Sequence, residues 1–117
     1  GISKANADML HEKLKEYEFY EYMSPSKFVN SNWCPVFISW AEDDIFCKGQ
    51  GEAMTDALKK NIENVSTYSA KGILNNHCYH LFLKSNKYAE ECMRKSVDFI
   101  NEVKVLEKDT KIPTQVQ

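Results

Sequence analysis

One short segment constrains the fold more than any other part of the chain. Residues 34–40 read Cys-Pro-Val-Phe-Ile-Ser-Trp, an apolar run rich in β-branched and aromatic residues without strict polar alternation. Such a run predicts a strand that is covered on both faces, which is typical of a parallel sheet. The run gives way abruptly to Glu42, Asp43 and Asp44. We therefore expect the chain to leave the sheet at this acidic cluster.

The residues that follow predict a crossover to a second strand. Residues 49–62 have the spacing of an amphipathic helix, and residues 65–69 resemble a second, weaker strand. The expected buried stripe of the helix comprises Ala53, Met54, Ala57, Leu58 and Ile62. A helix between two strands allows them to run parallel. We predict that the two strands are parallel neighbours.

Two more helices are expected, one at each end of the chain. Ser3 can cap a first helix, and Asn86 can cap a last one. The apolar positions of the first helix are Ala7, Leu10, Leu14 and Tyr17, and one face of the last helix carries Ala89, Cys92, Met93, Ser96, Phe99, Ile100 and Val103. This alternation of helices and strands predicts an α/β fold, with two parallel strands and flanking helices.

The connecting segments set the expected divisions of the chain. Phe19 to Met23 form an aromatic stretch before Ser24-Pro25, and proline disfavours helix in the residue before it, so we expect a turn or an extended connection there. Residues 72–80 resemble a loop, and residues 104–117, with Pro113, resemble a frayed polar tail. We thus divide the chain into residues 1–23, a helix and connection; residues 24–103, the α/β segment; and residues 104–117, the tail.

Acidic and histidine side chains follow the two predicted strands. The carboxyl ends of parallel strands lie at one edge of a sheet, where ligands and catalytic groups gather, so Asp43 or Asp44 is expected near His77 or His80. A carboxylate beside an imidazole fixes its tautomer and stabilises the imidazolium formed in general-base catalysis. An acidic turn or a loop histidine is, by itself, more often structural. Here the acidic cluster precedes the histidine loop with a helix between them, and this order favours a catalytic role.

Five motifs, in order, resemble the closing third of α/β-hydrolases, nearest the hormone-sensitive-lipase and carboxylesterase branch. They are Ser24-Pro25, Cys34-Pro35-Val36-Phe37-Ile38, Asp44-Ile45-Phe46, Gly51-Glu52-Ala53 and His77-Cys78-Tyr79-His80-Leu81-Phe82. In that family a Ser-Pro precedes a Pro-Pro-led strand, which ends in an Asp-x-Leu turn. A helix then opens with Gly-Glu-Ala, and a later loop contains His-Gly-Phe-His. The resemblance implies the C-terminal portion of an α/β-hydrolase fold.

The resemblance also implies catalytic roles. Asp44 matches the acid of a catalytic triad, with Asp43 as the alternative one position earlier. His77 matches the catalytic base and His80 the second, non-catalytic histidine, although His80-Leu81-Phe82 also fits a histidine followed by a spacer and an aromatic residue. The chain departs from the family pattern at Cys78-Tyr79, where Gly-Phe is usual, at Lys48, where aspartate is frequent, and at Ala41, where glycine commonly ends the strand.

The nucleophile of the family is missing from this sequence. It lies in a G-x-S-x-G turn, and the triad order in this fold is serine, acid, histidine. None of the nine serines here has that context, so we expect the serine and the oxyanion hole to lie upstream of Gly1. The resemblance thus implies a carboxylesterase or lipase acting on carboxylic esters, of which this chain alone is an inactive fragment. The alternative is a catalytically inert, hydrolase-like binding or interaction domain.

A metal site is the other alternative that we considered. The segment His77-Cys78-Tyr79-His80 clusters possible ligands, to which Cys34, Cys47 and Cys92 could be added. Structural zinc sites usually combine two close ligand pairs, and the sequence has no C-x-x-C partner for the histidines. We therefore expect no metal and no cofactor.

Charge and cysteine content bear on partners and compartment. A formal net charge of -2 gives no reason to expect nucleic acid, and no apolar run is long enough for a membrane span. The expected partners are a small-molecule ester and either the N-terminal part of the same hydrolase or a second copy of the chain. The four dispersed cysteines favour reduced core residues over disulfides. The expected location is the cytoplasm, with secretion after removal of a signal as the alternative.

Overall fold

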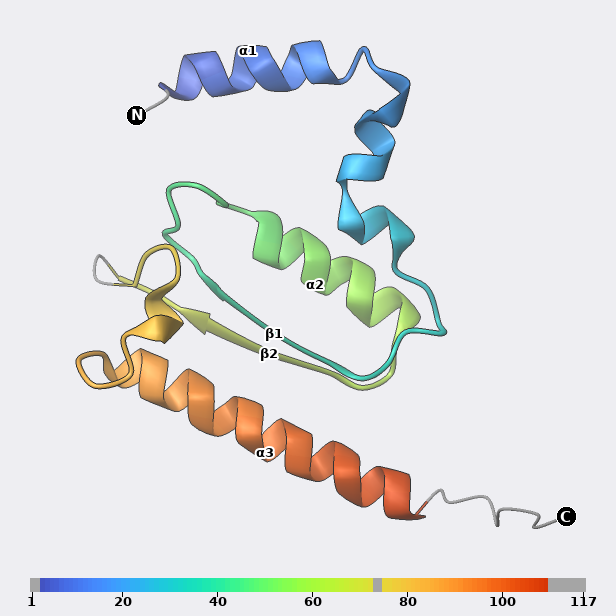
Figure 1. Cartoon of the computed structure of the whole chain (residues 1–117), viewed down its shortest axis with the longest axis vertical. Helices are drawn as coiled ribbons and strands as arrows, with labels where there is room; N and C mark the ends of the chain where they lie inside the picture. Colours follow the sequence, from blue (N-terminus) through green and yellow to red (C-terminus); the bar gives the residue numbers. More distant parts are fainter. Residues whose placement is uncertain (1–2, 73–74, 110–117) are drawn as a thin grey trace, which may run out of the picture.

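The computed structural model describes residues 3–72 and 75–109. It is a mixed α/β structure (Figure 1). Its elements, in order, are α1 (Lys4–Leu14), the 3-10 helices η1 (Glu18–Met23) and η2 (Pro25–Phe28), β1 (Val36–Ala41), α2 (Gln50–Asn61), β2 (Val65–Ala70), the 3-10 helix η3 (Tyr79–Leu81) and α3 (Lys87–Asp109).

The predicted strand pair is present. Among the described residues β1 and β2 form a two-stranded parallel sheet, in a register that pairs Val36 with Val65 and Ala41 with Ala70. Helix α2 connects the end of β1 to the start of β2, as the sequence predicted. Both strands therefore end at the same edge of the sheet, and the loops after Ala41 and Ala70 leave it together.

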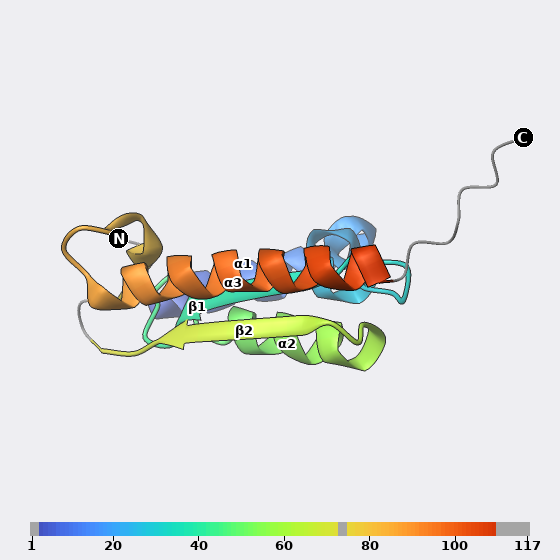
Figure 2. The ribbon, with the colours of Figure 1, turned by 90° about the horizontal axis from the view of Figure 1, so that it is seen from below.

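Helices cover both faces of this sheet. Helix α2 lies on one face and α3 on the other, and all three layers are visible when Figures 1 and 2 are compared. This arrangement explains why β1 is apolar on both faces. Leu58 of α2 is fully buried, and the core at the α3 side comprises Ala41, Ala70, Tyr79, Ala89 and Cys92, with Phe37, Tyr68 and Tyr88 packed against it.

The two predicted N-caps are confirmed. The Ser3 hydroxyl accepts a hydrogen bond from the amide of Asn6 at the start of α1. The Asn86 side-chain oxygen accepts one from the amide of Tyr88 at the start of α3. Each side chain satisfies an amide that has no partner within its own helix, which favours helix initiation at these positions.

The expected connection between α1 and the sheet was only partly correct. Ser24 is extended, with φ -110° and ψ 94°, as the proline after it requires. On either side, however, the chain forms the short helices η1 and η2 rather than a turn or an extended segment. Pro25 occupies the first position of η2, where its fixed φ suits a helical turn and its missing amide hydrogen costs no hydrogen bond.

The expected boundary of the tail was wrong. Helix α3 continues to Asp109, so residues 104–109 are helical rather than frayed. Val105 and Leu106 are 57% and 47% exposed, so burial does not explain the extension. These residues include good helix formers, such as leucine, glutamate and lysine, which can extend an established helix by one residue at a time. Pro113 and the rest of the expected tail lie outside the described residues.

The apolar face of α3 is narrower than its pattern indicated. Ala89 and Cys92 are buried, whereas Met93 and Ile100 are about half exposed. The cysteines also differ from the expectation of core residues, because Cys34 and Cys78 are exposed and Cys47 is only partly buried, although all four thiols are free. Within residues 3–72 and 75–109, no helix has the length and apolar character needed to cross a bilayer.

Candidate active site

Asp44 lies in a tight turn directly after β1. Its amide donates to the carbonyl of Ala41, which closes the turn at a distance of 3.2 Å. Its Oδ1 accepts hydrogen bonds from the amides of Phe46 at 2.7 Å and Cys47 at 3.0 Å. A short acidic side chain that binds the amides two and three residues ahead is a local device for shaping a turn. One carboxylate oxygen is thereby occupied by the backbone, and Oδ2 remains for another partner.

His77 lies in the loop after β2, seven residues beyond the end of that strand. The loop is anchored two residues later by Tyr79, whose side chain is buried in the core against α3. Cys78, between them, has a left-handed backbone conformation with φ 59°. The buried tyrosine and this sharp change in chain direction hold His77 at the edge of the sheet where β1 and β2 end.

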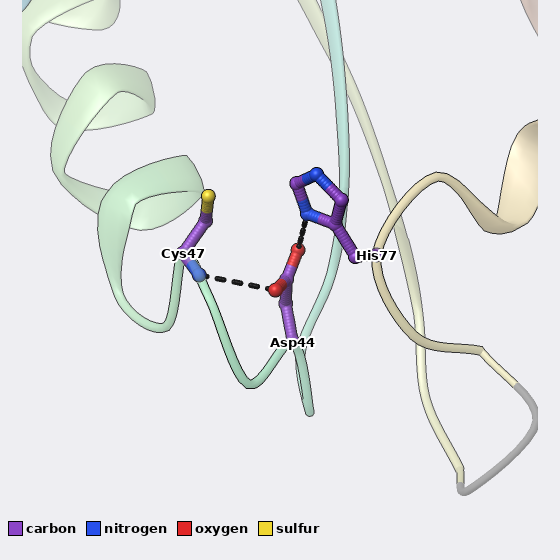
Figure 3. A group of neighbouring side chains, drawn as sticks. All are labelled: Asp44, Cys47 and His77. Carbon is purple, nitrogen blue, oxygen red and sulfur yellow. Dashed lines mark hydrogen bonds and ion pairs between the residues drawn. The ribbon is translucent and has the colours of Figure 1, made fainter. Parts of the chain in front are cut away.

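The two predicted residues meet directly. His77 Nδ1 lies 2.8 Å from Asp44 Oδ2, as Figure 3 shows. An ionised carboxylate can only accept hydrogen bonds, so Nδ1 carries the proton and donates it. In this tautomer the other ring nitrogen, Nε2, has the free lone pair, and it points away from Asp44 (Figure 3). The geometry provides an oriented imidazole that can accept a proton at Nε2.

The surroundings of Asp44 keep it ionised. Burial by itself would raise the pKa of this carboxyl, since its side chain is only 10% exposed. The hydrogen bond from His77 and those from the amides of Phe46 and Cys47 act in the opposite direction and outweigh burial, so the pKa of Asp44 lies below its ordinary value. Asp44 is therefore a stable negative charge beside the imidazole at neutral pH.

Asn76 joins the two loops of the site and was not predicted. Its Oδ1 accepts a hydrogen bond from the amide of Ile45 at 3.3 Å and one from the amide of His77 at 2.8 Å. The ring of Phe46 contacts the imidazole edge-on, with centroids 5.3 Å apart. The hydrogen bond from the His77 amide to Asn76 and the ring contact with Phe46 restrict the position of His77. The sequence offered one indication of this role, since Asn76 directly precedes a candidate histidine. Its contact with Ile45, 31 residues away, can be seen only in the fold.

The two alternative candidates, Asp43 and His80, lie outside this contact. Asp43 is exposed, and its Oδ2 accepts a hydrogen bond from the amide of Gly72 at 3.0 Å. His80 is also exposed and contacts the ring of Tyr79, with centroids 6.0 Å apart. The structure therefore brings together Asp44 and His77, and the pairing of Asp43 with His80 is absent from the described hydrogen bonds and ion pairs. The catalytic role of Asp44 and His77 stays a prediction.

A different set of potential metal ligands gathers here than the one considered from the sequence. Asp44, Cys47 and His77 each offer a ligand atom, and these atoms lie within 4.8 Å of one another. Neither His80 nor Cys34 or Cys92 belongs to a group of this kind in the part of the chain that the structure describes. Cys47 was among the possible ligands named from the sequence, but Asp44 was not, and the position of Cys47 beside this pair depends on the turn at Asp44.

Comparisons with known proteins identify no relative. No protein-family model matches the chain, and neither a curated protein nor a solved structure is significantly similar to it.

Proposed function

We propose that this chain supplies the acid and the base of a serine hydrolase of the carboxylesterase or lipase type, acting on carboxylic esters. The nucleophilic serine would come from a segment outside these 117 residues. The observation that carries the proposal is the hydrogen bond from His77 Nδ1 to Asp44 Oδ2, at the edge where two parallel strands end. Active sites of open parallel sheets occur at this edge.

In the proposed reaction His77 acts as general base and then as general acid. Its Nε2 takes the proton of the serine hydroxyl as the serine oxygen attacks the ester carbonyl, and later gives that proton to the leaving alcohol. Asp44 accepts the hydrogen bond from Nδ1 throughout. It thereby holds the imidazole in the productive tautomer and stabilises the imidazolium formed between the two steps.

Two backbone positions support the resemblance to α/β-hydrolases. Cys78 stands where that family has glycine, and its φ of 59° lies in the left-handed region that glycine adopts most easily. Gly51, the glycine of the Gly-Glu-Ala motif, packs so closely on Trp40 that a Cβ atom would lie 2.3 Å from Trp40 Cγ. In both places the local backbone suits the family's glycine.

The open edges of the sheet favour the proposal that a partner segment completes the fold. The described residues form two paired strands, so each strand has one edge without a strand beside it. Unpaired edges favour association with another strand. In the proposed enzyme, the N-terminal part of the hydrolase occupies an edge and brings the nucleophile and the oxyanion hole to His77. A second copy of this chain would cover an edge but would not supply the nucleophile.

The proposal is tested with ester hydrolysis by the intact protein. The first step is to read the coding sequence upstream of Gly1 for a G-x-S-x-G turn followed by a helix. The protein that contains it should hydrolyse a short p-nitrophenyl ester, and His77→Ala or Asp44→Asn should lower kcat by roughly 10⁴-fold or more, because triad members act as a unit.

Matched variants come from the neighbouring residues. His80→Ala and Asp43→Asn should retain nearly full kcat, since neither contributes to the described pair. Collapse of activity in these two variants, with His77 and Asp44 variants still active, would assign the triad to the other residues. An intact protein without esterase activity would favour the inert binding or interaction domain. The isolated 117-residue chain should show no turnover that depends on His77.

A further inference from the structure

We propose that Asp44, Cys47 and His77 form a binding site for a zinc ion, which switches off the Asp44–His77 pair. The first observation is geometric: a carboxylate oxygen, a thiol sulfur and an imidazole nitrogen lie within 4.8 Å of one another. Figure 3 shows the thiol of Cys47 and the ring of His77 on the same side of the Asp44 carboxylate. The inhibitory part of this inference rests on the function proposed above, whereas zinc binding does not.

The ligand chemistry favours zinc over harder cations. Zinc binds thiolate, imidazole and carboxylate, and sites with three protein ligands leave a fourth position open to water or to an inhibitor. Magnesium and calcium prefer sites made of oxygen ligands. One thiol, one imidazole and one carboxylate therefore select a thiophilic divalent cation.

The distances require small shifts in two directions, in which the Asp44–His77 pair widens and Cys47 approaches it. Ligand atoms around a tetrahedral zinc ion lie about 3.5 Å apart, from its usual bond lengths of about 2.0 to 2.3 Å. The Asp44–His77 pair is already closer than that, at 2.8 Å between Oδ2 and Nδ1. Cys47 is the ligand that approaches, and its side chain is only partly buried at the start of the segment that leads into α2. Binding releases the thiol proton to solvent as the zinc–sulfur bond forms.

Zinc binding and base catalysis exclude each other. If the ion binds Nε2, it takes the lone pair that would accept the serine proton. If it binds Nδ1, the ring proton moves to Nε2, which then has no lone pair to offer. Either arrangement prevents His77 from acting as a general base, so zinc should inhibit the proposed hydrolase and a chelator should restore its activity.

Binding is measured first on the reduced 117-residue protein, with zinc alone as the probe. Competition against a chromophoric chelator should show one equivalent of zinc per chain. Cobalt in its place should give a thiolate-to-cobalt charge-transfer band that Cys47→Ser abolishes. Cys47→Ser and His77→Ala should each weaken zinc binding about ten-fold or more, whereas Cys34→Ser, at an exposed cysteine outside the group, should leave the affinity unchanged. Circular dichroism of each variant checks that it is folded.

The outcomes separate this inference from the proposed function. The absence of stoichiometric zinc uptake, an unchanged affinity in Cys47→Ser, or equal binding of magnesium would overturn the zinc site. In the intact esterase the zinc concentration for half-inhibition should rise about ten-fold or more in Cys47→Ser, relative to that variant's own uninhibited rate. Zinc binding to a protein without esterase activity would leave the metal site standing and reject the hydrolase. Esterase activity without zinc binding would reject the metal site and leave the hydrolase standing.

Discussion

Helices α1 and α2 have similar lengths, 11 and 12 residues, but they contribute differently to the structure. Helix α1 begins with a side-chain cap at Ser3, whereas α2 begins after Gly49 without one. Yet no residue of α1 is buried, while α2 buries Thr55 and Leu58. The difference is the sheet: α2 has a surface to cover, and Leu10 of α1 remains 53% exposed. Good local signals start a helix, but packing determines what the helix contributes to stability.

The sharpest test of this difference is the same substitution in both helices. Leu58→Ala should lower the free energy of unfolding by about 2–5 kcal/mol, because it removes a fully buried side chain and leaves a cavity between α2 and the sheet. Leu10→Ala should change it by less than about 0.5 kcal/mol. Urea unfolding followed by circular dichroism measures both. Equal losses at the two positions would mean that α1 packs as tightly as α2.

A smaller effect is expected from adding one methyl group to α2. Gly51→Ala would place a Cβ atom 2.3 Å from Trp40 Cγ, so α2 and β1 must separate or the indole must move. The expected cost is about 1–3 kcal/mol, typical of overpacking, although alanine favours helix more than glycine does. The neighbouring exposed residue provides the control, Glu52→Ala, with an expected change below about 0.5 kcal/mol. A thermal melt in which Gly51→Ala is the more stable protein would contradict the close approach of helix and strand.

The smallest effect is expected when the protein is acidified, and it concerns Asp44 in the turn after β1. Because the pKa of Asp44 is lower in the folded protein than in the unfolded chain, its ionisation contributes stability above the ordinary aspartate pKa of about 3.9. That contribution is lost as the pH falls through the lower, folded-state value. Below about pH 4 the urea midpoint of unfolding, followed by circular dichroism, should therefore fall more steeply with pH in the wild type than in Asp44→Asn. Equal slopes in the wild type and in Asp44→Asn would contradict the lowered pKa of Asp44.

The sequence predicted the two paired strands, the helix between them and the capping residues of α1 and α3. The unbroken apolar run of β1 indicated a sheet covered on both faces, and the caps at Ser3 and Asn86 were correct because capping depends on only a few neighbouring residues. The meeting of strand ends predicted Asp43 or Asp44 near His77 or His80, and the resemblance to α/β-hydrolases selected Asp44 and His77, the two residues that the structure brings together.

Other features depend on contacts that no local pattern encodes. The sequence did not predict that α1 is exposed, because a regular spacing of apolar residues does not show whether another surface is there to cover them. The position of Cys47 follows from the turn that Asp44 shapes, and the bridge made by Asn76 joins residues far apart in the chain. The continuation of α3 to Asp109 was missed because the charged composition of its last turns resembles that of a disordered tail.

The two oxygens of Asp44 have consequences for how the site assembles during folding. Oδ1 binds amides two and three residues away, whereas Oδ2 binds an imidazole 33 residues along the chain. The acid can thus adopt its place as soon as one turn forms, with little loss of chain entropy. We expect the base to reach this position only after β2 has paired and Tyr79 has been buried beside α3, because the contact requires closure of the long intervening loop. A partial opening that detaches α3 would separate His77 from Asp44 and leave the turn intact.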